Sequence, residues 1–263
     1  MIRDLFLSEE TRKERYGELA RAGKAKEASE NLHRLNRGTY VPDFVYGAND
    51  GIVTTFAVVA GATGALFSPA VIIILGIANL VADGFSMGAS SFLSLKSARG
   101  FVNAQKTKEE WEVQEYPEIE IKETEFLLGE IGVPSSAASE VAQGIAADKQ
   151  RWVKFLVREK LGLKDGEDHG SPLRHGMATF AAFLTVGFIP LLPYLLGTGD
   201  HDQFLISVFL SGLAFFLVGA ARTLVTDESA WKGGLEILLV GGLAASVAYG
   251  LGWLIRSLFG IVL

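Results

Sequence analysis

Two aspartates, Asp50 and Asp83, lie inside long apolar stretches of this sequence. A charge at the centre of a membrane helix costs about 2.5–3.5 kcal/mol on insertion scales, so such residues are rare and commonly functional. Two neighbouring carboxylates could bind a cation, carry a proton, or share one proton as in an aspartic protease. The flanking residues are Asn-Asp-Gly and Ala-Asp-Gly. Intramembrane aspartyl proteases use Tyr-Asp and Gly-x-Gly-Asp instead, so we do not expect an enzyme.

The second apolar stretch has four polar residues at the spacing of one helix face: Asn79, Asp83, Ser86 and Ser90. Met87 borders this face, and Thr54 lies one turn above Asp50. Oxygen ligands beside a thioether suit a transition metal such as Fe²⁺ or Mn²⁺ better than Ca²⁺ or Mg²⁺. The alternative is structural: each aspartate would be neutral or hydrogen-bonded to a neighbouring helix, and Met87 would fill the core.

A second group of acids occupies residues 109–130, which contain nine acids and one base. Carboxylates three residues apart share a helix face, so a pair of them can be presented to one ion. Two such pairs occur: Glu109 with Glu112, and Glu120 with Glu123. Further along, Glu159 falls on the apolar stripe of Trp152, Phe155 and Leu156, where a charge needs a bound partner. These five glutamates form a candidate metal site; the alternative is an ordinary solvated face.

Membrane helices are needed to position the two aspartates. A bilayer core of about 30 Å requires roughly 20 mostly apolar helical residues. Five stretches qualify: Phe44–Phe67, Pro69–Phe92, Gly176–Leu196, Phe204–Leu224 and Gly234–Leu254. The first two form an antiparallel hairpin, which would place both aspartates in one layer, and Pro190 and Pro193 predict a kink in the third. Small residues at helical spacing predict close helix packing: Gly47/Gly51, Gly84/Gly88 and Gly242/Ser246/Gly250.

The basic residues predict the orientation, because they concentrate on the cytoplasmic side. With a cytoplasmic N-terminus, the inner segments contain 23 of the 24 lysines and arginines. The fold class is therefore an all-α integral membrane protein with five transmembrane helices and a helical cytoplasmic insert between helices 2 and 3. Four regions follow: a cytoplasmic amphipathic segment at 1–43, helices 1 and 2 at 44–95, the acidic insert at 96–173, and helices 3 to 5 at 174–263, with the C-terminus outside.

Turn and capping residues predict the helices of the insert. The second span should continue as a helix to Tyr116, and Pro117 suits the first position of the next helix. Pro134 should precede a third helix, and Asp148 should cap a fourth that ends at Gly162.

Composition excludes several other classes of protein. Residues 1–43 and 96–173 contain 43 of the 54 charged residues, unlike a soluble globular core or a disordered chain. The absence of cysteine excludes thiol catalysis and thiolate metal sites, and the net charge of −6 argues against nucleic acid as a partner. No histidine has a second ligand at metal spacing, so each is expected at the surface: His33, His169, His175 and His201.

Two segments resemble the vacuolar iron transporter family: Asp-Gly-Ile-Val-Thr-Thr-Phe-Ala-Val-Val-Ala-Gly-Ala at 50–62 and Asn-Leu-Val-Ala-Asp-Gly-Phe-Ser-Met-Gly at 79–88. The resemblance extends from about Tyr40 to the C-terminus. It implies a homodimer that moves Fe²⁺, and often Mn²⁺, out of the cytosol in exchange for protons, along a pathway between the protomers. Co²⁺ and Zn²⁺ are further candidates, and no tightly bound cofactor is expected. The membrane would be the plasma membrane of a bacterium or archaeon, or the vacuolar membrane of a eukaryote.

The resemblance also implies roles for individual residues. Asp50 and Met87 would line the pathway, and we add Asp83, Asn79 and Thr54 from their spacing. The metal-binding carboxylates of the insert would be Glu109, Glu112, Glu120, Glu123 and Glu159.

The sequence departs from the family at two places. Leu156 and Val157 replace a Met-Met pair that many members carry in the insert, and Asn79 stands where some members have a glutamate. Two other functions stay open: a membrane-bound metal sensor or buffer without transport, and a scaffold whose acidic insert docks a basic partner.

Overall fold

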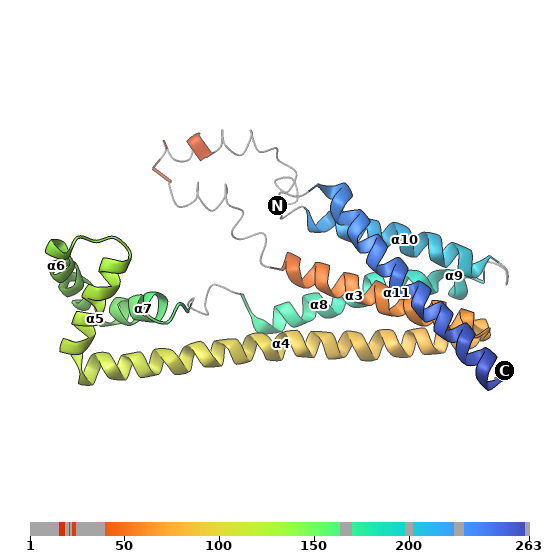
Figure 1. The fold of residues 1–263 in the computed structure, drawn as a ribbon, viewed down its shortest axis with the longest axis horizontal. Coiled ribbons are helices and arrows are strands. Elements are labelled where there is room, and N and C mark those ends of the chain that lie inside the picture. Colours follow the sequence, from red (N-terminus) through yellow and green to blue (C-terminus); the bar gives the residue numbers. More distant parts are fainter. Residues whose placement is uncertain are drawn as a thin grey trace. The chain divides into compact units, whose positions relative to one another are not determined.

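The computed structural model describes residues 16–18, 21, 23–24, 40–163, 170–197, 202–223 and 229–260, so most of the segment 1–43 lies outside the described residues. Every regular element in the described part is a helix, which confirms the all-α class (Figure 1). The chain divides into two compact units. Residues 1–91 and 173–263 form the membrane unit, and residues 92–172 form the insert unit.

The membrane unit contains long apolar helices whose outer faces suit lipid. Its elements are α3 (Val41–Gly64), the first half of α4 (Pro69–Glu115), α8 (Pro172–Gly187), η3 (Ile189–Leu191), α9 (Leu192–Leu195), α10 (Gln203–Arg222) and α11 (Ala230–Phe259). Large apolar side chains point outward, with Phe85 69%, Phe209 71% and Leu243 67% exposed. Apolar surface of this extent is unfavourable in water and ordinary in a bilayer.

Four stretches among the described residues are long and apolar enough to cross a membrane: Pro69–Glu115, Pro172–Leu195, Gln203–Arg222 and Ala230–Phe259. The protein is therefore a multi-pass membrane protein. The helix α3 is not among these four. At 24 residues it is long enough, but the polar side chains of Asn49 and Asp50 lower its hydropathy. A fifth span at α3 stays a prediction.

Two prolines shape the third predicted span. The helix α8 ends at Gly187, and Pro190 and Pro193 lie in the first turns of η3 and α9. Because proline lacks a backbone N–H and clashes with the preceding turn, the helix cannot continue unbroken. The predicted kink is confirmed.

The helices α3 and α8 touch backbone to backbone at two glycines. A Cβ atom on Gly47 would lie 2.3 Å from the carbonyl oxygen of Thr179, and one on Gly51 would lie 2.4 Å from that of Phe183. Similarly, a Cβ on Gly88 would lie 2.9 Å from the carbonyl oxygen of Gly176 in α8. These contacts confirm the close packing predicted from small-residue spacing.

The third predicted small-residue stripe behaves differently. A Cβ atom on Gly242 or Gly250 would meet nothing within 4 Å. The described chain therefore provides no packing partner for these two glycines, and the close packing predicted for this part of α11 stays a prediction. Spacing shows which residues share a face, but it does not show whether that face meets another helix.

The insert unit consists of the second half of α4 with α5 (Pro117–Glu130), α6 (Ser135–Ala146) and α7 (Lys149–Glu159). The side chain of Asp148 accepts hydrogen bonds from the backbone N–H groups of Gln150 and Arg151, which confirms the predicted cap. The helix α7 ends at Glu159 rather than at Gly162. The N–H of Leu161 bonds back to the carbonyl of Leu156, so the chain leaves the helix before reaching the glycine.

Gly51→Ala should destabilise the membrane unit, because the added methyl group would push α3 away from α8. Overpacking of this kind costs about 1–3 kcal/mol. Gly242→Ala is the matched control, since its methyl group would enter open space. Thermal unfolding in detergent should show a lower midpoint for Gly51→Ala alone, and equal midpoints for the two variants would refute the close contact.

Candidate metal centre

Four glutamates from two helices converge in the insert unit. Glu109 and Glu112 share a face of α4, and Glu120 and Glu123 share a face of α5. The chain reverses between these helices at Tyr116 and Pro117, where the N–H of Glu120 bonds to the carbonyl of Tyr116. The reversal turns the two acidic faces toward each other.

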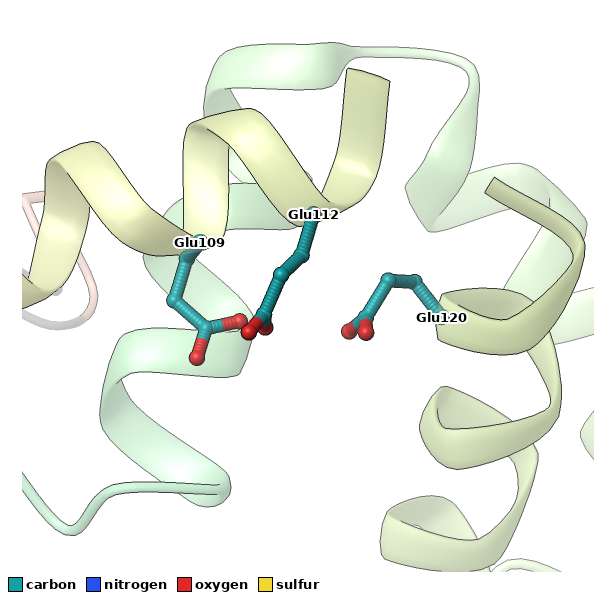
Figure 2. A group of neighbouring side chains, drawn as sticks. All are labelled: Glu109, Glu112 and Glu120. Carbon is teal, nitrogen blue, oxygen red and sulfur yellow. The ribbon is translucent and has the colours of Figure 1, made fainter. Parts of the chain in front are cut away.

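The carboxylates are close enough to bind one ion. Oxygen atoms of Glu109, Glu112 and Glu120 all lie within 4.8 Å of one another. Figure 2 shows the carboxylates of Glu109 and Glu112 next to each other, with Glu120 pointing toward them from α5. Glu109 is 3% and Glu120 4% exposed, so half of the cluster is removed from water. Oxygen donors in this arrangement suit a divalent cation.

A buried hydrogen bond holds α5 against α7 behind the cluster. The indole Nε1–H of Trp152 donates to the hydroxyl oxygen of Thr124 at 2.8 Å. That hydroxyl in turn donates to the backbone carbonyl of Glu120 at 2.7 Å. Trp152 also belongs to the apolar core of the unit with Val113 and Leu156. The position of Glu120 therefore depends on packing inside the insert.

One basic side chain enters the cluster. The Lys160 Nζ lies 3.3 Å from Glu109, 3.0 Å from Glu112, 3.3 Å from Glu120 and 3.0 Å from Glu123, measured to a carboxylate oxygen of each. Burial by itself would lower the pKa of Lys160. Hydrogen bonds to Glu123 and Glu112 and the charges of Glu109 and Glu120 outweigh burial, so the pKa is raised above its ordinary value. The side chain stays an ammonium.

Lys160 was not predicted as a site residue. Its spacing could have pointed to the site, because Trp152, Leu156 and Lys160 are successively four residues apart and share one helix face. Glu159, which was predicted, lies beside that face. Its carboxylate is 2.6 Å from the Nε of Arg158, and it is not among the three glutamates that lie within 4.8 Å of one another. The metal-binding role predicted for Glu159 stays a prediction.

Leu156 and Val157, which the resemblance aligns with a methionine pair, lie in the core of the insert. Leu156 is fully buried and Val157 is 4% exposed, and both pack with Trp152. Neither side chain offers a ligand atom. The donor atoms that converge in the described part of the insert are carboxylate oxygens.

The predicted pathway residues lie in the membrane unit. Asp50 on α3 and Asp83 on α4 are both part-buried, and their charges are close enough to repel each other. Within the described residues Asp50 forms no ion pair with a base. The Nδ2 of Asn79 is buried without a hydrogen-bond partner in the described structure. Met87 is part-buried on the same helix.

Thr54 and His175 have structural partners. The hydroxyl of Thr54 donates to the backbone carbonyl of Asp50 at 2.7 Å. His175 is 6% exposed, and its Nδ1 lies 2.6 Å from an oxygen of Asp43. The prediction of a surface position for His175 is wrong, because α8 packs against α3 at Gly47 and encloses the ring. The other three histidines lie outside the described residues.

Thr124→Val should loosen the insert unit, because the buried indole N–H of Trp152 would lose its acceptor. An unsatisfied buried donor costs about 1–3 kcal/mol. Thr107→Val is the control, since the Thr107 hydroxyl bonds only to its own helix at an exposed position. Hydrogen exchange of α5 and α7 amides should accelerate in the first variant and not in the second. Equal exchange would show that this bond does not hold the two helices.

Comparison with known proteins agrees with the resemblance seen in the sequence. The model of the VIT family matches residues 41–253. The chain is 33% identical over 236 residues to a vacuolar iron transporter of Toxoplasma gondii, covering 87% of this chain and 78% of the relative. It is 30% identical over 212 residues to vacuolar iron transporter 1 of Arabidopsis thaliana, covering 81% and 84%. A vacuolar iron transporter of Plasmodium falciparum is 30% identical over 233 residues, covering 86% and 85%. This chain therefore belongs to the VIT family.

Proposed function

We propose that this protein transports Fe²⁺, and also Mn²⁺, out of the cytosol in exchange for protons. The observation that carries the proposal is Asp50, a part-buried acid in the membrane unit with a second acid nearby and no basic partner in the described structure. An ionised carboxylate inside a membrane helix costs several kcal/mol, and binding a transported cation would compensate for that cost. The relatives' names, vacuolar iron transporter, support iron as the cargo.

Proton coupling follows from the chemistry of one carboxylate. Asp50 can hold a metal ion when ionised and releases the ion when a proton arrives from the outer side. A group that alternates between the two cations couples their fluxes. Asp83, Asn79 and Met87 would complete the ligand set, because oxygen and thioether donors together suit Fe²⁺ and Mn²⁺.

The insert would supply metal to this pathway from the cytosol. A concentrated group of carboxylates raises the local concentration of divalent cations near the inner mouth. The strong bias of basic residues favours a cytoplasmic insert, an N-terminus inside and a C-terminus outside. In this proposal α3 is the first of five spans and two protomers enclose the pathway.

Asp50→Asn should abolish transport, because the amide cannot exchange a metal ion for a proton. Purified protein in liposomes should take up Mn²⁺ faster when the lumen is acidic, whereas the variant should match empty liposomes under both conditions. Asp202→Asn is the control, since Asp202 lies at the N-terminus of α10 and makes no side-chain cap bond. Undiminished uptake by Asp50→Asn would remove this residue from the mechanism. Metal binding without any uptake by the wild type would favour a sensor or buffer.

The double variant Glu109→Ala/Glu112→Ala should raise the KM for metal more than it lowers the maximal rate, because it removes capture and leaves the pathway intact. Glu110→Ala/Glu115→Ala is the matched control. It removes the same charge from exposed positions of the same helix. The same liposome assay checks the prediction, and equal KM values for the two double variants would contradict a role for the cluster in capture.

A further inference from the structure

Lys160 occupies the point on which four carboxylates converge. Its Nζ is 3.0–3.3 Å from one oxygen each of Glu109, Glu112, Glu120 and Glu123. These acids come from α4 and α5, whereas Lys160 immediately follows α7. The ammonium therefore joins all three helices of the site through ion pairs.

The cluster needs a cation to stay assembled. Glu109 and Glu120 are almost fully buried, and buried carboxylates of like charge repel each other strongly unless a positive charge lies between them. An ammonium group has three donors that can be shared among the surrounding oxygens. The close contacts to Lys160 supply this compensation within the chain itself.

A metal ion would need the same oxygen atoms. Divalent cations bind oxygen ligands at about 2.0–2.6 Å, and the cluster's oxygens already lie within 4.8 Å of one another. An ion coordinated by Glu109, Glu112 and Glu120 would have to sit where the ammonium now sits. Two positive charges cannot share that space without strong repulsion.

We propose that Lys160 is a tethered competitor for this site, an internal cation that a divalent metal must displace before it can bind the four glutamates. The proposal rests on the proposed function in taking the cluster as a metal site. The lysine stem is long and flexible, and the side chain is 20% exposed, so it can swing toward solvent. The apparent association constant for metal then equals the intrinsic constant multiplied by the fraction of molecules in which Lys160 has left the site.

The site of the insert is then occupied in two alternative ways, by the Lys160 ammonium or by a metal ion. Without metal, Lys160 holds α4, α5 and α7 together. With metal, the ion takes over that role and the ammonium is released. The cluster would then respond only to metal concentrations high enough to displace the lysine, which protects it from filling at low concentrations.

Lys160→Met tests the proposal by removing the competitor while keeping the stem. Isothermal titration of Mn²⁺ into the full chain in nanodiscs should show binding at least about tenfold tighter than in the wild type, because the site is always vacated. Lys149→Met is the matched control. It removes the same charge from the first residue of α7, where Lys149 bonds to Gln114 at an exposed position. An unchanged or weakened affinity in Lys160→Met would overturn the proposal.

A second measurement covers the case in which Lys160→Met loosens the insert. Metal-free Lys160→Met should exchange its α5 and α7 amides faster than the wild type, and Mn²⁺ should restore protection. A second comparison is between Glu123→Gln and Glu123→Gln/Lys160→Met. Both keep three glutamates, and the double variant has the net charge of the wild type. The double variant should bind Mn²⁺ more tightly than the single one. No restoration by metal, or equal affinities in this pair, would also overturn the proposal.

These outcomes are separable from those of the proposed function. Wild-type protein that binds Mn²⁺ but carries none across the liposome membrane would defeat transport and leave the competition intact. Normal flux with equal binding by Lys160→Met and wild type would defeat the competition alone.

Discussion

A carboxylate removed from water needs a nearby cation or a proton. This constraint explains the surroundings of the acidic side chains within each unit. In the insert, four glutamates are gathered on the facing sides of α4 and α5, and two of them are almost fully buried. They can remain together because Lys160 places one ammonium among them. The apolar core around Trp152 then holds α7, and with it the lysine, in register with the acids.

The membrane unit meets the same constraint in another way. Asp50 and Asp83 repel each other, and neither forms an ion pair with a base in the described part of the chain. Within the residues that the structure describes, no basic side chain neutralises the pair. A carboxylate in that condition takes up a proton or a cation from outside, which is the chemical basis of the exchange proposed for this family member.

Backbone contacts make the position of Asp50 definite. Gly51 follows it directly and brings α3 against α8 at Phe183, with no room for a Cβ atom. The glycine face of α3 is therefore the face that meets α8. The insert, by contrast, contains its whole carboxylate cluster and Lys160 within residues 109–160.

The sequence by itself determined the helical class, the apolar stretches, the aspartates within them and the paired glutamates, because these depend on composition and on the periodicity of a helix. It also determined the break at Pro190 and Pro193 and the cap at Asp148, because those are local effects of a single residue. Only the tertiary structure decided which faces meet. It brought Lys160 into the cluster, enclosed His175 against Asp43, and left Gly242 without a neighbour in the described chain. Each of these depends on how segments far apart in the chain pack, and a periodic pattern says nothing about the partner that a face will find.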